Sequence, residues 1–347
     1  MVIQWLSIAL MLILIGVFLA VLPHLSRRDE FFAVTVVPSF RKTADARRIL
    51  RSYRSRLLGA SLLALGVLSV LAVLRGEQWT SLPFLLLVAG QFIATVRANK
   101  AVRPFAVSPT GLRVASLQPR RSSLPGGVLA WLGPFLILGV SAFYVASRWN
   151  EIPARFPIHW SLGGAPNVWA TRTPLGVFQI ALFGAACCLL TFVYAWQGTR
   201  QSRGPIAMRN FNARHLLVSS YGIAATFGWL SCRLPFGNGA PGAITIGIIV
   251  GSGLLFNAGS VYFGRRAKAR ADLESTATDH DDIAIGDQTP DRRWLGGLIY
   301  FNPDDPALFV EQRIGFGYGI NFGRPGAWAI VCLVLLIPVA TLWLANT

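Results

Sequence analysis

The sequence predicts an all-α polytopic membrane protein with about eight transmembrane helices and a small β-containing cytoplasmic insert before the last helix. Hydrophobic residues make up 53% of the 347 residues and charged residues only 14%. Apolar runs of roughly 20 residues, the length that a helix needs to cross a bilayer, recur along the chain. Between these runs, 27 of the 32 Lys and Arg residues fall on alternate loops. This alternation indicates a multi-pass protein with a fixed orientation, because cytoplasmic loops retain an excess of Lys and Arg.

The predicted spans are residues 2–22, 57–74, 79–96, 128–146, 175–196, 216–234, 243–263 and 327–344. The loops richest in Lys and Arg follow the first, third, fifth and seventh of these spans, so we expect both termini to lie outside a bacterial plasma (inner) membrane. The first run lacks the basic start and the small-residue cleavage site of a signal peptide, which favours a retained anchor. We divide the chain into five segments, residues 1–127, 128–263, 264–291, 292–326 and 327–347.

A net charge of +17 raises the question of nucleic-acid binding. The positive charges are spread over four loops and accompany no base-stacking module, so no nucleic-acid partner is expected. The basic stretch from Arg41 to Arg56 is compatible with a helix that continues into the second span. We expect it to contact membrane lipids through their anionic headgroups, at about 1 kcal/mol per basic residue near the surface.

The predicted spans contain no Asp, Glu or Lys. Ionisable groups inside a membrane commonly mark ion paths and coupled transport, so their absence argues against a proton- or sodium-coupled transporter. A carrier of neutral or lipid-like molecules stays open. The four cysteines lie in apolar spans without metal spacing, and we expect no metal and no cofactor.

The loop at residues 147–174 combines Pro, Gly and Trp residues, which preclude a long helix and suit the membrane–water interface. We expect a compact, irregular cap on the outer face. Its run IPARFPIHWSLGGAPNVW resembles the signature of a membrane domain of unknown function found in SdpI-type toxin-immunity proteins and their relatives. The resemblance implies that an extracellular peptide is bound outside and a regulator is held inside. The contact residues it implies are Pro157, His159, Trp160, Gly164, Asn167 and Trp169.

His159 has three readings. It could hydrogen-bond backbone carbonyls and lock the loop, contact a ligand or partner, or take part in catalysis. Zinc needs three or four ligands, and the outer loops offer few besides this histidine. No catalytic residue is therefore predicted here.

The last large loop begins with a polar linker that contains Asp279, His280, Asp281 and Asp282. Such a cluster could bind a divalent cation, or the linker could be solvated and disordered. Residues 292–326 then become aromatic and Gly-rich, and LFVEQR and GYGINF within them are typical of short strands. This stretch resembles a second domain of unknown function that is often fused behind the first. Its motif residues are Trp294, Tyr300, Asn302, Asp305, Glu311, Arg313 and Asn321.

We expect Glu311 and Arg313 to pair across this cytoplasmic domain. Two further fragments, residues 31–38 and 103–117, are rich in β-forming residues. We expect them to pair with each other or with residues 292–326 in one small cytoplasmic sheet.

Three functions are compatible with these features. The resemblance favours a non-enzymatic membrane protein that gives immunity to, or senses, an envelope-acting peptide or stress. The first alternative is a transporter or lipid-handling protein. The second is a membrane enzyme, which only the acidic linker supports, because convergent acids, bases or metal ligands are otherwise lacking.

Overall fold

The computed structural model describes residues 2–74, 79–109, 124–160, 166–201, 206–237, 259–267, 269–270, 285–287, 289–315 and 317–332, with residues 251, 253 and 336. The predicted spans at residues 243–263 and 327–344 lie largely outside these residues. So do Gly164 and the acidic cluster at residues 279–282.

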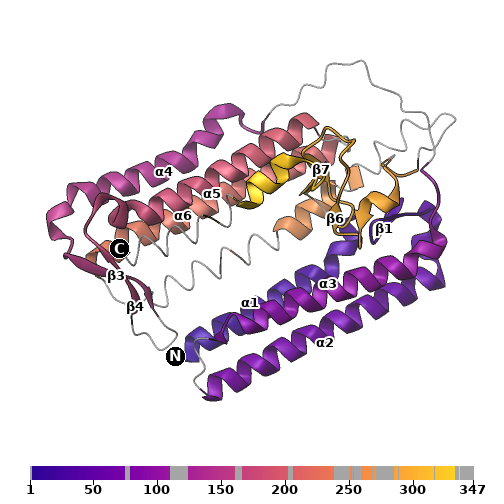
Figure 1. Cartoon of the computed structure of the whole chain (residues 1–347), viewed down its shortest axis with the longest axis horizontal. Coiled ribbons are helices and arrows are strands. Elements are labelled where there is room, and N and C mark those ends of the chain that lie inside the picture. Colours follow the sequence, from indigo (N-terminus) through magenta and orange to yellow (C-terminus); the bar gives the residue numbers. More distant parts are fainter. Residues whose placement is uncertain are drawn as a thin grey trace.

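Among the described residues, six long helices form two groups of three (Figure 1). Helices α1 (Val2–Val21), α2 (Ala44–Leu74) and α3 (Leu82–Val102) pack together in the first group. Helices α4 (Gly127–Ser147), α5 (Pro174–Gln201) and α6 (Ile206–Arg233) make up the second.

Within the part of the chain that the structure describes, five helical segments are long and apolar enough to cross a membrane. They coincide with the first five predicted spans, so the prediction of a multi-pass, mainly helical membrane protein is confirmed at this level. Eight spans are not confirmed. Helix α6 begins at Ile206, ten residues before the predicted span, and its first turns carry Arg209 and Arg214. The five segments are Trp5–Leu25, Ala44–Leu74, Leu82–Phe105, Gly127–Ser147 and Pro174–Thr199.

Helix α2 shows how the sequence sets a buried face. Ala46, Ile49, Tyr53 and Leu57 are buried, and these positions share one side of a helix. The basic stretch continues into the apolar one without a break, as predicted. Exposed apolar side chains such as Leu58 then suit contact with lipid rather than with other helices.

A β-hairpin joins α4 to α5. Strand β3 (Arg155–Trp160) pairs antiparallel with β4 (Pro166–Thr171), so the expectation of an irregular cap was wrong. The register shifts after Pro157, where a proline without an N–H interrupts the ladder. Phe156 and Ala170 anchor the hairpin in an apolar cluster with Val145, Ile152 and Val177.

The other strands form three more two-stranded hairpins. Strands β1 (Glu30–Phe31) and β2 (Val34–Thr35) follow α1. Near the C-terminus, β5 (Trp294–Leu295) pairs with β6 (Ile299–Tyr300), and β7 (Phe309–Glu311) pairs with β8 (Tyr318–Ile320). The predicted strands in LFVEQR and GYGINF are therefore confirmed.

The single cytoplasmic sheet expected from residues 31–38, 103–117 and 292–326 does not form among the described residues. The segments do meet, because the Val107 N–H donates to the Thr35 carbonyl over 3.0 Å. The Thr35 N–H, which could bond a neighbouring strand, instead donates to the Asp291 carboxylate over 3.1 Å. Side chains, rather than a continuous ladder, thus join the hairpins.

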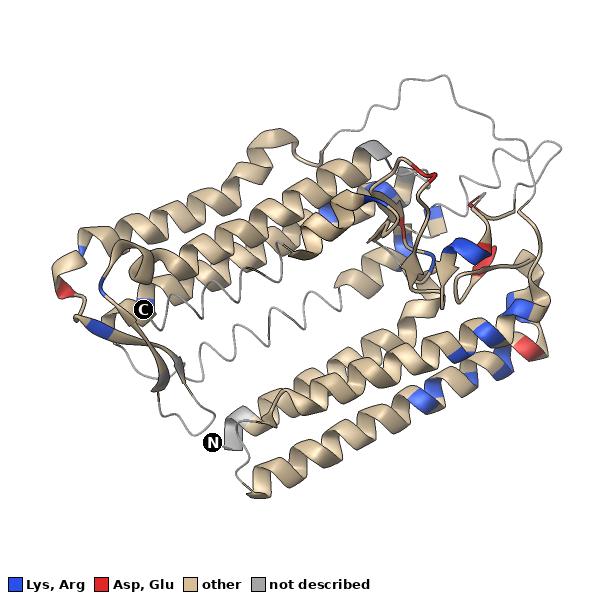
Figure 2. Ribbon diagram, viewed as in Figure 1, with Lys and Arg blue, Asp and Glu red and all other residues tan. Residues whose placement is uncertain are grey.

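The β3–β4 hairpin and strands β1 and β5–β8 lie at opposite ends of the helices (Figure 1). Lys and Arg gather mainly at the end that carries β1 and β5–β8 (Figure 2). Trp160 and Asn302 therefore stand at opposite ends of the molecule, as the alternation of charged loops predicts.

Candidate functional site: a buried charge cluster between the first and last hairpins

Arg313, just after β7, is the centre of a buried charge cluster. Its side chain is 1% exposed although it is fully polar at its tip. Nε and Nη2 donate to the two oxygens of Asp287, over 3.0 and 2.6 Å. Nη1 donates to Asp291 over 2.6 Å and to the Ala33 carbonyl over 3.0 Å, and Nη2 also reaches Thr289. The guanidinium carbon lies 5.5 Å above the Trp294 ring.

These bonds account for the ionisation of the pair. Burial disfavours both charges, but the hydrogen bonds with Asp287 outweigh it and raise the pKa of Arg313. Burial alone would also raise the pKa of Asp287, yet the bonds from Arg313 and Thr289 hold that pKa below its ordinary value. Two-pronged carboxylate pairing of this kind is among the strongest polar contacts in proteins.

Glu30 of β1 lies beside this pair in a less favourable setting. It is 1% exposed, and its Oε1 atom has no hydrogen-bond partner. Arg313 Nε lies 3.8 Å from Oε1, beyond hydrogen-bond distance. Burial raises the pKa of Glu30 to about 8, with Arg27 lowering it and Asp287 raising it further.

The turn between β1 and β2 is strained. Phe32 and Ala33 have φ values of 48° and 63°, the left-handed region that costs a non-glycine residue about 1–2 kcal/mol. Both carbonyls of the turn are held from outside. Asn99 Nδ2 donates to the Phe32 carbonyl over 2.8 Å, and Arg313 donates to the Ala33 carbonyl. We call this hairpin, as held by Arg313 and Asn99, the clasp.

Arg41 completes the clasp from the start of the basic stretch. Its guanidinium donates to the carbonyls of Pro23, Ser26, Arg27 and Glu30. The expectation that the whole stretch faces lipid headgroups is therefore corrected at Arg41, whose donors are turned inward. The exposed basic residues of the stretch begin at Lys42 and continue with Arg47, Arg48, Arg51, Arg54 and Arg56.

The expected pair of Glu311 with Arg313 gives way to the pairs of Arg313 with Asp287 and Asp291. Burial raises the pKa of Glu311 to about 7, and Arg27 is the first cation that offsets this. Asp287 and Asp291 were missed because they fall in the stretch predicted as a polar linker. The usable signal was the pair of acids in GDQTPD, directly before the aromatic motif.

Four of the predicted motif residues stabilise turns in the C-terminal domain (residues 292–326). Asn321 is fully buried, and its Nδ2 donates to the carbonyls of Asn302, Asp305 and Ala307 over 2.8–3.2 Å. Its Oδ1 accepts the Asn302 N–H over 2.9 Å. Tyr300 donates to Asp305 over 3.0 Å. These side chains shape the domain and leave little of their polar surface for a ligand.

The C-terminal domain contacts both helix groups. Gly297 has a φ of 78°, and a Cβ there would lie 2.8 Å from Asn99 Nδ2 of α3 and 3.0 Å from the Phe32 carbonyl oxygen, so the position favours glycine. On the other side, the Tyr194 ring of α5 packs edge-on against Phe309 and Tyr318. The domain therefore bridges the two groups at one end.

At the far end, the β3–β4 hairpin brings the predicted outer residues together. Backbone pairing sets Pro157 opposite Trp169, and Trp160 opposite Pro166. Trp169 is 39% exposed. His159 pairs with Val168 through its backbone, but the side chains of His159 and Asn167 are not described, so the three readings of His159 stay open.

Arg172 closes the base of this hairpin. Its Nη1 atom donates to the Ile152 carbonyl over 2.8 Å, and its N–H donates to the Ala154 carbonyl. This role of Arg172 was missed because its acceptor, the Ile152 carbonyl, lies 20 residues earlier in the chain.

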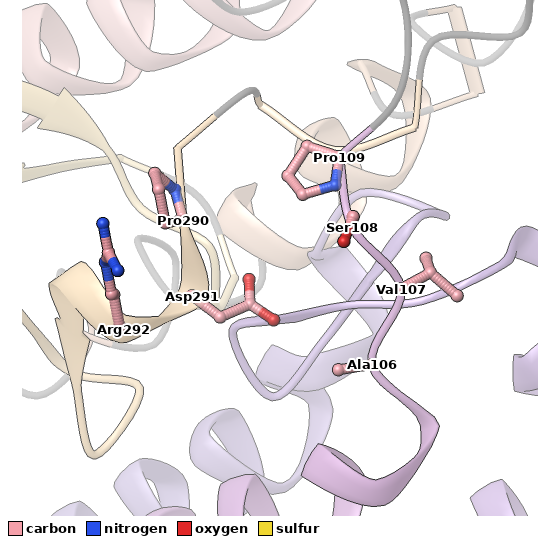
Figure 3. Close-up of a pocket in the computed structure, with 7 residues that line it drawn as sticks. All are labelled: Ala106, Val107, Ser108, Pro109, Pro290, Asp291 and Arg292. Atoms are coloured by element: carbon pink, nitrogen blue, oxygen red, sulfur yellow. The ribbon is translucent and has the colours of Figure 1, made fainter.

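An open groove of about 710 Å³ lies beside the clasp, lined by residues 106–109 and 290–292. Figure 3 shows the Asp291 carboxylate pointing across it toward residues 106–109. That carboxylate is already engaged by Thr35 and Arg313. Within the described ranges, no group of three or more His, Cys, Asp or Glu residues could hold a metal ion.

Comparison with known families finds two matches, neither with an assigned function. Residues 136–185, which include the β3–β4 hairpin, match a domain of unknown function (DUF1648). Residues 303–328 match a family of unknown function (DUF5808). No curated protein and no solved structure matches the chain. The chain is thus a membrane protein in which two segments match families of unknown function.

Proposed function

We propose that this protein is a non-enzymatic sensor of, or immunity factor against, an envelope-acting peptide in a bacterial inner membrane. The β3–β4 hairpin faces outward and contacts the peptide, and the C-terminal domain faces the cytoplasm and presents the response to a regulator. The resemblance of residues 152–169 to the SdpI-type signature supports this assignment.

The supporting observation is that one helix connects the two regions. Strand β4 ends at Thr171 and α5 begins at Pro174, so the hairpin and the helix are joined by a two-residue link. A helix of 28 residues is about 42 Å long. Near its other end, the Tyr194 ring centroid lies 5.1 Å from that of Phe309 and 5.6 Å from that of Tyr318. A tilt or shift of α5 at the hairpin therefore moves the surface on which the C-terminal domain rests.

The hairpin surface suits an amphipathic peptide. Trp169 is exposed, Trp160 is half-buried, and Arg155 is exposed at the start of β3. Tryptophan supplies a large apolar face with a polar N–H, which favours peptide contact close to the headgroup layer.

The exposed basic residues of α2 give the same protein a lipid partner. Arg47, Arg51 and Arg54 are exposed in the first half of α2, and the exposed Lys42 lies just before this helix. We propose that they bind anionic headgroups of the inner leaflet and hold the clasp end at the membrane surface.

The test compares a deletion strain with strains that express the protein or single variants, each challenged with a panel of membrane-active peptides. We expect expression to protect against at least one peptide and Trp169→Ala to reduce that protection. Trp79→Ala is the matched control, because Trp79 is an exposed tryptophan on the linker between α2 and α3. Identical survival of deletion and expressing strains under every peptide would contradict the proposal.

A further inference from the structure

Glu30 combines three features that the proposed function does not use. Its side chain is buried between β1, residues 287–291 and the segment after β7. Its Oε1 atom has no hydrogen-bond partner. It also sits two residues before the strained turn of the clasp. A buried ionised carboxylate with an oxygen that accepts no hydrogen bond is costly, whereas the neutral acid avoids most of that cost.

The surroundings do not supply a clean counter-charge. Arg27, the cation that lowers the pKa of Glu30 most, donates both Nε and Nη2 to Asp29. Arg313 faces Glu30 but is already bonded to Asp287 and Asp291. Arg41 donates to the Glu30 carbonyl rather than to the carboxylate. Acidic groups crowd the same space. The charged groups that face Glu30 or its neighbour Glu311 are Arg27, Asp29, Arg41, Arg209, Asp287, Asp291 and Arg313.

The turn beside Glu30 is positioned to open. Phe32 and Ala33 stay in the left-handed region while Asn99 and Arg313 hold their carbonyls. Strained non-glycine turns persist only where neighbouring contacts over-determine them. If Arg313 turns toward an ionised Glu30, the bond to the Ala33 carbonyl is lost and the turn can relax.

We propose that Glu30 is a proton-binding site that controls the clasp. With a proton on Glu30, the β1–β2 hairpin stays docked on Arg313. When the O–H bond breaks, the proton passes to solvent water, the carboxylate keeps the electron pair, and the hairpin loosens. The ligand of this site is the proton itself, and the proposal does not depend on any peptide.

The direction of the pH response follows from linkage. Burial raises the pKa of Glu30 from 4.5 to about 8, so the docked form binds the proton more tightly than an open, solvated form does. The docked form is therefore most favoured at low pH, and this advantage is lost as the pH rises through about 8. Glu311, whose pKa is raised to about 7, acts in the same direction.

The first test is infrared spectroscopy on the full chain in nanodiscs. We expect the carbonyl stretch of a protonated carboxylic acid to be present at neutral pH in the wild type and to fade with a midpoint near 8. Glu30→Gln should remove that component and Glu311→Gln should leave it. Glu151→Gln should also leave it, because Glu151 is exposed and its hydrogen bond with Arg148 lowers its pKa. A wild-type spectrum without this band at neutral pH overturns the proposal.

The second test reports the opening itself. In a background with the four native cysteines replaced by alanine, Val34→Cys places a thiol at a buried position of the clasp. Val37→Cys places one at a nearby exposed position and corrects for thiol ionisation. We expect the labelling rate of Val34→Cys, divided by that of Val37→Cys, to rise as the pH passes from about 6 to 9. The rise should be up to about tenfold for each unit by which the pKa of Glu30 differs between the docked and the open form. Adding Glu30→Gln should leave at most the smaller rise that Glu311 contributes.

The proposal is overturned if the ratio does not change with pH while Glu30 is intact. It is also overturned if the ratio rises as much in the variants that carry Glu30→Gln as in those that do not. Both measurements proceed without any peptide, so they can fail while the protection assay succeeds, and the reverse also holds.

Discussion

The guanidinium of Arg313 and the carboxylate of Asp287 form a two-pronged ion pair, with Nε 3.0 Å from Oδ2 and Nη2 2.6 Å from Oδ1. This pair connects the β7–β8 hairpin with a segment that precedes the C-terminal domain. Through its third nitrogen, the same arginine reaches the Ala33 carbonyl in the first hairpin. One side chain thus joins three separate segments of the chain.

Replacing Arg313 should disrupt this junction. Arg313→Ala leaves the partly buried Asp287 and Asp291 and the buried Glu30 without this counter-charge, which we expect to cost up to about 3–5 kcal/mol of unfolding free energy. Arg313→Lys should also destabilise, because an ammonium cannot make the two parallel bonds. Chemical denaturation in detergent measures both. The matched control is Arg48→Ala, which removes an exposed ion pair with Asp45 and should change stability far less. Equal effects at the two sites would show that the buried junction is not structural.

Asn321 should be essential to the C-terminal domain. Asn321→Ala leaves three carbonyls without their donor, at about 1–3 kcal/mol for a buried group left unsatisfied. Hydrogen exchange of residues 299–320 should increase in this variant. The exposed Asn150 supplies the control substitution, and exchange that is unchanged in Asn321→Ala would refute the assignment.

Gly198 should limit how closely α5 and the C-terminal domain approach. A Cβ at this position would lie 2.2 Å from the Tyr318 ring, so Gly198→Ala must displace that ring. We expect faster limited proteolysis of residues 292–326. Gly222→Ala, at a glycine of α6 with no atom within 4 Å of the added carbon, should not accelerate cleavage. If both variants are cleaved alike, the contact does not hold the domain.

The exposed basic residues of α2 should determine lipid preference. Replacing Arg47, Arg51 and Arg54 with Gln should weaken retention of anionic lipid by about 1 kcal/mol per residue at low salt. Mass spectrometry of lipid bound to the purified protein measures this, and added salt should reduce the difference. Arg155→Gln, at the opposite end of the molecule, is the control. Unchanged lipid retention in the triple variant would exclude this surface.

Stability should have two pH limbs with separate origins. The lowered pKa of Asp287 stabilises the fold above the ordinary carboxyl range, and this contribution is lost as the pH falls through the folded-state pKa. The raised pKa of Glu30 acts oppositely, with stability lost as the pH rises toward about 8. Thermal unfolding across pH should show both limbs. Asp287→Asn should reduce the acid limb and leave the alkaline one. Glu30→Gln should reduce the alkaline limb to the part that Glu311 contributes, and leave the acid one. The reverse assignment would contradict these roles.

The sequence predicted the first five spans because their apolar length is a local property. It also predicted strands β7 and β8, because the composition of LFVEQR and GYGINF is likewise a local property. It mistook the start of α6, since Arg209 and Arg214 made a helical segment look like a loop. It also took the β3–β4 hairpin for an irregular cap, because prolines hid the pairing that Phe156 and Ala170 anchor.

The charge cluster was beyond local reasoning. Glu30, Asp287 and Arg313 look like ordinary loop charges when each is taken with its neighbours in the chain. Their meeting depends on how the helix groups bring the first and last loops together. Arg41 illustrates the same limit, since its basic neighbours face outward while its own donors turn to four carbonyls.

The distance along the chain between Ala33 and Arg313 has a consequence for biosynthesis. Their bond spans 280 residues, and ribosomes add roughly 5–20 residues per second. The first helices are therefore inserted with an unfinished hairpin, which waits on the order of tens of seconds for its last contact to be translated. A nascent chain that stops early keeps that hairpin undocked, so docking distinguishes a completed chain from a truncated one.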